Sequence, residues 1–222
     1  MTDTIRFRDL TVADFVHKLA SAEPVPGGGS AAAIAASLGG ALVAMVASLS
    51  EGRPKYAEHA ALHAEAIAAG NALADRFLAL ADEDSDAYAG YGHAMKMPRD
   101  TDEERDARAA AIRAAAHKSS MAPFRTVQAC LEMVAMAEAL AGRSNKNASS
   151  DLEVASLMAV AASHAAAANV FINLPSIGDE SVARDLLART ELLVDEIDRV
   201  AARTREAVRS GESRDPLPAN PA

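Results

Sequence analysis

The chain has 222 residues, a formal net charge of −9, one cysteine and no tryptophan, and 54 of its residues are alanine. A single cysteine excludes a disulfide framework and a cysteine-based zinc site, and a net negative charge argues against a general nucleic-acid binder, which needs basic patches. Alanine is the best helix former and aromatic residues make up only 4% of the chain, so the composition predicts an all-α protein.

The first half of the chain is predicted to form three helices with short breaks between them. Thr11, with Asp14 three residues later, starts a helix that runs to about residue 22. The segment PVPGGG at 24–29 interrupts it, and Ser30 can cap an uncharged helix that reaches about residue 50. After a break at 52–54, a long amphipathic helix is expected over 55–92.

Four more helices are predicted in the second half, over 101–117, 121–141, 149–172 and 179–209. A proline at 98, a polar loop at 142–147 and a turn at 175–178 separate them. The prediction is an all-α, single-domain helical bundle of about seven helices that spans residues 1–209. Residues 210–222 are expected to form a disordered C-terminal tail.

Two segments, 24–50 and 154–178, contain no Asp, Glu, Lys or Arg and are long enough to span a bilayer. Ala, Gly and Ser dominate both, and no Trp or Tyr belt flanks them. We therefore expect two buried Ala-rich helices at the centre of a bundle and no membrane partner. The N-terminal sequence lacks the apolar region of a signal peptide, so the expected location is cytoplasmic.

Polar residues that interrupt this Ala-rich interior are candidates for a binding or catalytic site. The glycine triplet at 27–29 precedes a helix and exposes backbone N–H groups that suit an anion or a carbonyl oxygen, although tight packing alone also explains it. Lys55 and Tyr56 stand between two predicted helices, where a lysine would neutralise an anionic substrate or donate a proton. Without other information, a solvated turn with a partly buried tyrosine is the favoured interpretation of this pair.

The run Asp82-Glu83-Asp84-Ser85-Asp86 places four acids within five residues of one helix. Burial of one of them would raise its pKa into the range of a general base, and Asp84 shares a helix face with Ala81 and Tyr88. The other three acids are expected on a solvated face. No metal is predicted, because the run has no second acidic motif to complete a magnesium site.

A second group of polar residues follows the loop at 142–147. It comprises Asn145, Asn147, Ser150 and Asp151, of which the Ser-Asp pair also suits a helix start. Asn169 and Asn173 lie four residues apart on one face of a segment expected to be buried. Buried amides must find hydrogen-bond partners, either the edge of a heterocycle or the neighbouring backbone.

The segments PVPGGGSAAA, GRPKY, ADEDSDAY, NKNASSDLEVA and AANVFINL occur in this order over about residues 10–200. Together they resemble the formiminotetrahydrofolate cyclodeaminase and methenyltetrahydrofolate cyclohydrolase family. The resemblance implies an all-helical homodimer that binds a folate near the subunit interface, with no cofactor beyond the tetrahydrofolate substrate. It implies catalytic roles for Asp84, Lys55, Tyr56 and Asp151, and substrate-binding roles for Gly27, Gly28, Gly29, Ser30, Asn145, Asn147, Ser150, Asn169 and Asn173.

Two positions depart from the family pattern. Pro54 stands where a lysine is usual, and Glu51 stands where an apolar residue is common, which thins the positive charge available to a substrate carboxylate. The resemblance implies hydrolysis of 5,10-methenyltetrahydrofolate to 10-formyltetrahydrofolate. We expect this activity and not the alternative, a cyclodeaminase that releases ammonia, because the 222 residues contain no formiminotransferase pattern that would supply a formimino substrate.

Two other functions stay open at this point. One is a non-catalytic helical dimer that binds a folate or another anion, suggested by Pro54. The other is a di-metal carboxylate bundle, which needs Glu-x-x-His pairs that Glu132 and Glu138 lack.

Overall fold

The structure is a computed structural model that describes residues 6–213. Within this range it contains six α-helices and no strand, which confirms the predicted all-α bundle. The helices are α1 (Val12–Leu19), α2 (Gly28–Ser48), α3 (Ala60–Met95), α4 (Asp102–Leu140), α5 (Ser149–Asn173) and α6 (Glu180–Ser210). Short 3-10 turns occur at Phe7–Asp9, Pro54–His59, Lys146–Ala148 and Leu174–Ser176.

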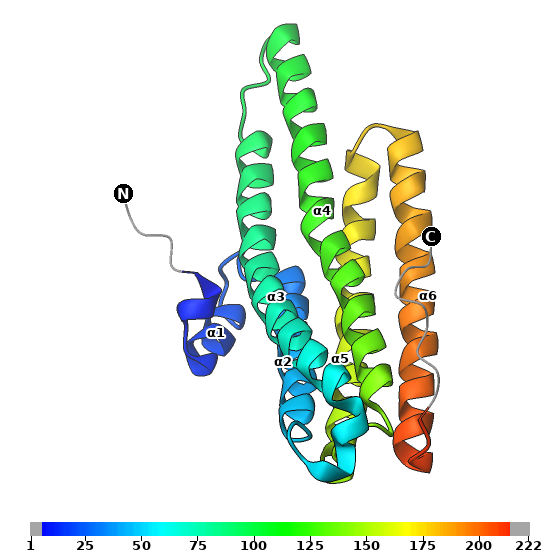
Figure 1. Ribbon diagram of the computed structural model, residues 1–222. Helices are drawn as coiled ribbons and strands as arrows, with labels where there is room; N and C mark the ends of the chain where they lie inside the picture. Colours follow the sequence, from blue (N-terminus) through cyan, green and yellow to red (C-terminus); the bar gives the residue numbers. More distant parts are fainter. Residues whose placement is uncertain (1–5, 214–222) are drawn as a thin grey trace.

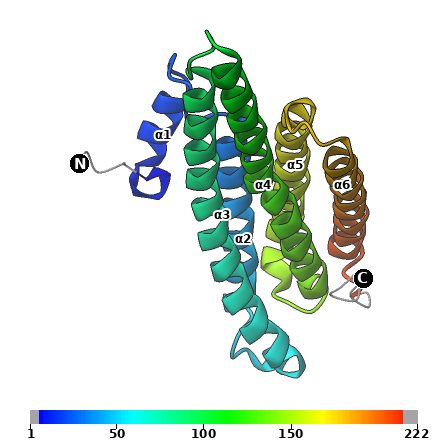
Figure 2. The ribbon, with the colours of Figure 1, turned by 90° about the horizontal axis from the view of Figure 1, so that it is seen from above.

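Helices α2 to α5 form a four-helix bundle in which each helix packs against its two neighbours (Figure 1). Helix α2 contacts α3 and α5, and α4 contacts α3 and α5, so the four close into a ring. Helix α6 packs on α5 and α4, whereas α1 stands beside α3 on the other side of the bundle (Figure 2).

Helix α4 is continuous where the sequence predicted two helices. The break expected between His117 and Met121 is absent, and Pro123 lies inside the helix. A proline in a helix interior removes one hydrogen bond and costs about 3 kcal/mol. Phe124 and Val127 are buried next to it, Phe124 in a small cluster with Val170 and Val127 in the main core, and their burial offsets this cost.

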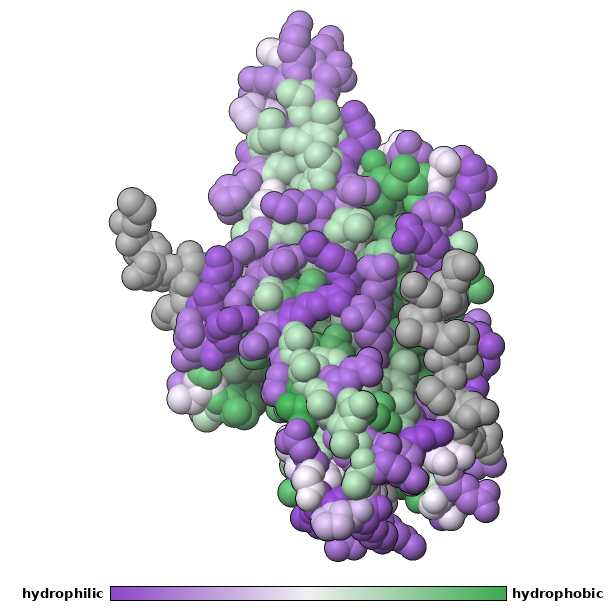
Figure 3. Space-filling view, viewed as in Figure 1, coloured by the Kyte–Doolittle hydropathy of each residue, from purple (hydrophilic) through white to green (hydrophobic). Residues whose placement is uncertain are grey.

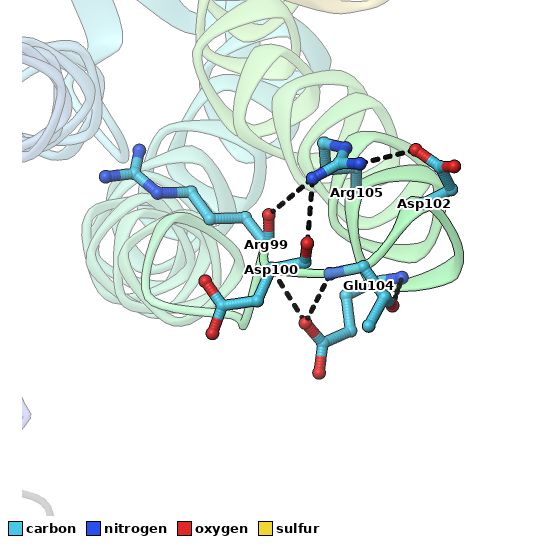
Figure 4. A network of polar contacts seen from close by, with 6 residues as sticks. Arg99, Asp100, Asp102, Glu104 and Arg105 are labelled. Atoms are coloured by element: carbon cyan, nitrogen blue, oxygen red, sulfur yellow. Dashed lines mark hydrogen bonds and ion pairs between the residues drawn. The ribbon is translucent and has the colours of Figure 1, made fainter.

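Two of the predicted helix starts are confirmed, and a side chain caps each of them. The backbone N–H of Asp14 donates to the Thr11 hydroxyl at 3.1 Å. Thr101 and Glu104 form a capping box, in which the Glu104 N–H donates to Thr101 Oγ1 at 3.2 Å and Glu104 Oε2 accepts from the Thr101 N–H at 3.1 Å (Figure 4). Helix α6 ends at Ser210, and most of the predicted tail, residues 214–222, lies outside the described residues.

The Ala-rich helices α2 and α5 lie side by side, and each keeps part of its surface exposed. In their most apolar windows 61% and 44% of the residues are buried, although α6 also packs on α5. The exposed part carries several apolar side chains on or next to the two helices: Leu38, Met45, Leu49, Val154, Leu157 and Ile172. It also carries His164 of α5, which pairs with Asp198 of α6 at 3.0 Å. By length and composition both helices could cross a membrane, a test that the core helices of a bundle also pass.

The face of the molecule shown in Figure 3 has a mixed character. In this view, hydrophilic residues predominate over α1 and across the middle of the molecule, whereas apolar patches lie along the upper part of the α3–α4 hairpin and over the lower part of this face.

Candidate functional site

The predicted site residues fall into two groups at opposite ends of α2. The group at the start of α2 comprises Gly27, Gly28, Gly29, Ser30, Asp84, Asn169 and Asn173, and the group beyond its end comprises Lys55, Tyr56, Asn145, Asn147, Ser150 and Asp151. Helix α2 has 21 residues. At a rise of 1.5 Å per residue, the two groups lie about 30 Å apart. One chain therefore does not bring all the predicted residues together.

Asp84 faces the first turn of α2. Its Oδ2 atom accepts a hydrogen bond from Ser30 Oγ at 3.1 Å, and that hydroxyl also lies 3.1 Å from the carbonyl oxygen of Ala81. Ser30 is therefore not the cap of α2 that the sequence predicted: the N-cap residue is Gly27, and Ser30 orients a carboxylate. A Cβ atom on Gly29 would lie 2.6 Å from Asp84 Oδ2, so the carboxylate needs a glycine at this position.

Burial raises the pKa of Asp84 above its ordinary value. Hydrogen bonds from the Ser30 hydroxyl and the Ser30 backbone N–H stabilise the charged form and offset part of that rise. A carboxylate in this situation exchanges protons closer to neutral pH than an exposed aspartate does, which suits a general base.

The three other acids of the run form hydrogen bonds or ion pairs with other parts of the chain. Asp82 is buried and accepts the backbone N–H of Phe7 at 2.8 Å, so it does not lie on the solvated face that the sequence predicted. Glu83 pairs with Arg125, and Asp86 pairs with Arg6 at 2.9 Å. Within residues 6–213, Asp84 is the acid of this run that faces the glycine segment.

Asn169 lies beside the same turn of α2. A Cβ atom on Gly28 would lie 3.5 Å from Asn169 Nδ2. The Asn169 amide donates to the Ala165 carbonyl, and the Asn173 amide, one turn further along α5, donates to the Asn169 carbonyl, both at 2.8 Å. Each of these two side-chain amides donates one N–H to a carbonyl of its own helix. The second N–H and the oxygen of the same amide can bind a ligand.

At the far end of α2, Tyr56 holds the loop that precedes α5. Its hydroxyl accepts the Lys146 backbone N–H at 3.1 Å, and Lys55 Nζ lies 5.4 Å from the centre of its ring. The hydrogen bond from Lys146 is the largest cause that lowers the pKa of Tyr56, and the charge of Lys55 adds to it. Lys55 itself is exposed, where it can meet an anionic group.

Asn145 makes more hydrogen bonds within the protein than the sequence indicated. It is buried, its backbone N–H donates to Ser50 Oγ at 2.7 Å, and its Oδ1 atom accepts the Asn147 N–H at 3.1 Å. Asn147 and Ser150 are exposed, and Asp151 is half-buried in the first turn of α5. The side chains of Asn147 and Asp151 are therefore better placed than Asn145 to meet a ligand.

His63 is a member of this group that sequence reasoning missed. It is buried, its Nε2 atom lies 2.9 Å from the Arg143 carbonyl oxygen, and its ring contacts Tyr56 edge-on at 6.5 Å between centroids. Together His63 and Tyr56 position residues 143–146. The only signal in the sequence is a histidine on the inward face of an Ala-rich helix, and without a known partner that pattern is ambiguous.

The sequence model of the formiminotransferase-cyclodeaminase family matches residues 11–192. A methenyltetrahydrofolate cyclohydrolase of Methylorubrum extorquens is 36% identical over 200 residues, which cover 90% of this chain and 96% of that protein. A formimidoyltransferase-cyclodeaminase of Gallus gallus is 33% identical over 182 residues, which cover 82% of this chain but only 34% of that longer protein.

Among solved structures, a formiminotetrahydrofolate cyclodeaminase of Thermotoga maritima superposes with a TM-score of 0.83 and 23% sequence identity, over 91% of this chain and 98% of that chain. At this identity the likeness shows a common fold. The family match covers most of the chain and includes both groups of site residues. The chain therefore belongs to the formiminotransferase-cyclodeaminase family.

Proposed function

We propose that this protein is a folate one-carbon enzyme that hydrolyses 5,10-methenyltetrahydrofolate to 10-formyltetrahydrofolate. The observation that carries the proposal is the placement of Asp84, a half-buried carboxylate with a raised pKa against the glycine segment at the start of α2. The cyclohydrolase of Methylorubrum extorquens aligns over nearly its whole length, which supports the same reaction. The alternative, ammonia release from a formimino substrate, is supported by the name of the Gallus gallus relative.

The reaction adds water to the cationic carbon that bridges N5 and N10. In our proposal, Asp84 accepts a proton as the water oxygen bonds to this carbon, and its charge stabilises the adjacent cation. The bond from the carbon to N5 then breaks while N5 gains a proton, which leaves the formyl group on N10. The balance is one water consumed and one proton released, and the step requires no redox cofactor or metal.

Asn169 and Asn173 are the residues we assign to the edge of the pterin ring, because they offer both donors and acceptors beside Asp84. The backbone N–H groups at the start of α2 lie on the same side. Lys55, in the second group, is assigned to an anionic end of the folate. This assignment leaves Lys55 about 30 Å from Asp84 within one chain.

A second copy of the chain resolves this separation. If two copies pack their open α2 and α5 sides together with antiparallel α2 helices, the start of one α2 comes to the end of the other. A two-fold interface has this geometry by symmetry. It would also bury the exposed apolar side chains, including Leu38, Met45 and Ile172. We therefore propose a homodimer with a site shared between subunits, acting in the cytoplasm.

Turnover assays test the proposed function. Purified protein is expected to accelerate the loss of methenyltetrahydrofolate absorbance well above the uncatalysed rate and to release no ammonia from formiminotetrahydrofolate. Stoichiometric ammonia release would instead identify the cyclodeaminase. Folate binding without turnover of either substrate would identify a non-catalytic folate binder and overturn the enzyme assignment.

A further inference from the structure

Aromatic side chains are scarce in this chain, which contains three tyrosines and no tryptophan. Tyr88 and Tyr91 lie four and seven residues after Asp84 on α3. These spacings place both rings on the helix face that Asp84 presents to the start of α2, one and two turns further along. Two of the three tyrosines therefore line the helix face that also carries the proposed general base.

The two rings have different surroundings. Tyr91 packs against the small apolar cluster that includes Phe124 and Val170, so burial in the fold accounts for it. Tyr88 is 51% exposed and belongs to neither apolar cluster of the described residues. Packing within the described residues therefore leaves a face of the Tyr88 ring free to contact a ligand, and an aromatic ring with a polar tip suits such a half-exposed position.

Tyr88 lies on the part of α3 that extends beyond the start of α2. Helix α2 begins at Gly28, level with Asp84, whereas α3 continues to Met95 and rises past the start of α2 (Figure 1). In an α-helix the Cα–Cβ bond tilts toward the N-terminus, so the Tyr88 side chain leans back over the turn that carries Asp84. A flat molecule held against the first turn of α2 therefore meets the ring of Tyr88.

From this geometry we propose that Tyr88 is a specificity-determining residue that stacks on the flat ring system of the folate substrate. This inference rests on the proposed function. The methenyl-bridged ring system is planar and carries a delocalised positive charge, and such a cation is attracted to the face of an aromatic ring. Stacking on Tyr88 would hold the bridging carbon over Asp84, which gives the site a preference for flat cationic heterocycles.

The test compares three variants at position 88 with the wild-type protein. Tyr88→Phe keeps the ring and is expected to leave KM for methenyltetrahydrofolate within about twofold. Tyr88→Leu and Tyr88→Ala remove it and are expected to raise KM about tenfold, as aromatic stacking of a base typically does, with kcat changed by less than about threefold. A matched control is His93→Ala, an exposed residue of the same helix on the face opposite Asp84.

Each outcome has a definite meaning. An unchanged KM in Tyr88→Ala, or an equal rise in Tyr88→Phe and Tyr88→Ala, would overturn the stacking role, because the ring would then make no difference. Thermal melts of every variant identify a folding defect, which is not expected for a side chain half in water. A wild-type protein that neither turns over nor binds a folate would refute the proposed function itself, and this result precedes any comparison of variants.

Discussion

Asp84 differs from its neighbours in the kind of group that faces it. Asp82 meets a backbone N–H group, and Glu83 and Asp86 meet arginines, whereas Asp84 meets a serine hydroxyl and the bare backbone of Gly29. Among residues 6–213 no cation contributes to the titration of Asp84, so desolvation is the largest effect and raises its pKa. The fold thus keeps one carboxylate of the run in a state suited to proton transfer.

Replacement of this carboxylate is expected to separate activity from stability. Asp84→Asn removes the proton acceptor, so kcat is expected to fall by about two to four orders of magnitude. The raised pKa means that the folded wild-type protein binds more protons than the unfolded chain between the ordinary pKa of about 3.9 and the raised value. Wild-type stability therefore decreases as pH rises through that window.

The neutral amide does not carry this penalty. Asp84→Asn is expected to melt at a higher temperature than the wild-type protein at neutral pH, with the difference shrinking below pH 4 or so. The matched control is Asp86→Asn, which breaks only a solvent-exposed pair with Arg6 and is expected to leave activity and the melting temperature nearly unchanged. A wild-type rate in Asp84→Asn would remove Asp84 from the reaction.

Among the elements, the crossing of α2 and α3 shows how the small residues are used. At Gly40 and Gly70 the two helices meet backbone to backbone: a Cβ atom on Gly70 would lie 2.7 Å from the Ala44 nitrogen, and one on Gly40 would lie 3.0 Å from the Ala74 nitrogen. This close approach sets the level of α2 against α3. It therefore also sets the height at which Gly29 meets Asp84.

Two glycines of α3 give a paired test of this crossing. Gly70→Ala improves helix propensity but forces a methyl group into the α2 backbone, and it is expected to lower the free energy of unfolding by about 1–3 kcal/mol. Gly90→Ala meets no atom within 4 Å and is expected to raise it by about 0.5–1 kcal/mol. Chemical denaturation measures both, and equal changes would show that the crossing tolerates a methyl group.

At the scale of the whole molecule, the arrangement of the two groups of site residues requires explanation. Each group is ordered by its own contacts. Ser30 and Gly29 position Asp84 at one end of α2, and His63 and Tyr56 position residues 143–146 at the other end. Exposed apolar side chains of α2 and α5 lie between the two groups. A shared site in a two-fold dimer accounts for both observations at once.

Mixing two inactive variants tests the shared site. Asp84→Asn and Lys55→Ala each damage a different group, so neither homodimer is expected to retain an intact site. After random subunit exchange half of the dimers are mixed and one of their two sites is intact, so activity is expected to recover to about a quarter of wild type. Co-purification of differently tagged chains confirms that mixed dimers form. No recovery in their presence would place each site within one chain, and a monomer in light scattering would refute the dimer.

The sequence alone determined much of the architecture, because helix formation is a local property. Alanine content, the breaks at glycine and proline and the Thr11 and Thr101 caps predicted an all-α bundle with most helix boundaries within a few residues. The order of the motifs identified the family. The unbroken α4 was missed because packing of the residues around Pro123, rather than local propensity, keeps the helix continuous through the proline.

Only the tertiary structure decided which residues act together. The four acids of the 82–86 run cannot be told apart from the sequence, and they differ in the residues that contact them from distant parts of the chain. These contacts are Phe7 with Asp82, Arg125 with Glu83, Ser30 with Asp84 and Arg6 with Asp86. The separation of the site into two groups follows from the antiparallel path of α3 along α2, which no motif encodes. A carboxylate takes its pKa and its role from the groups that fold around it, and those contacts exist only in three dimensions.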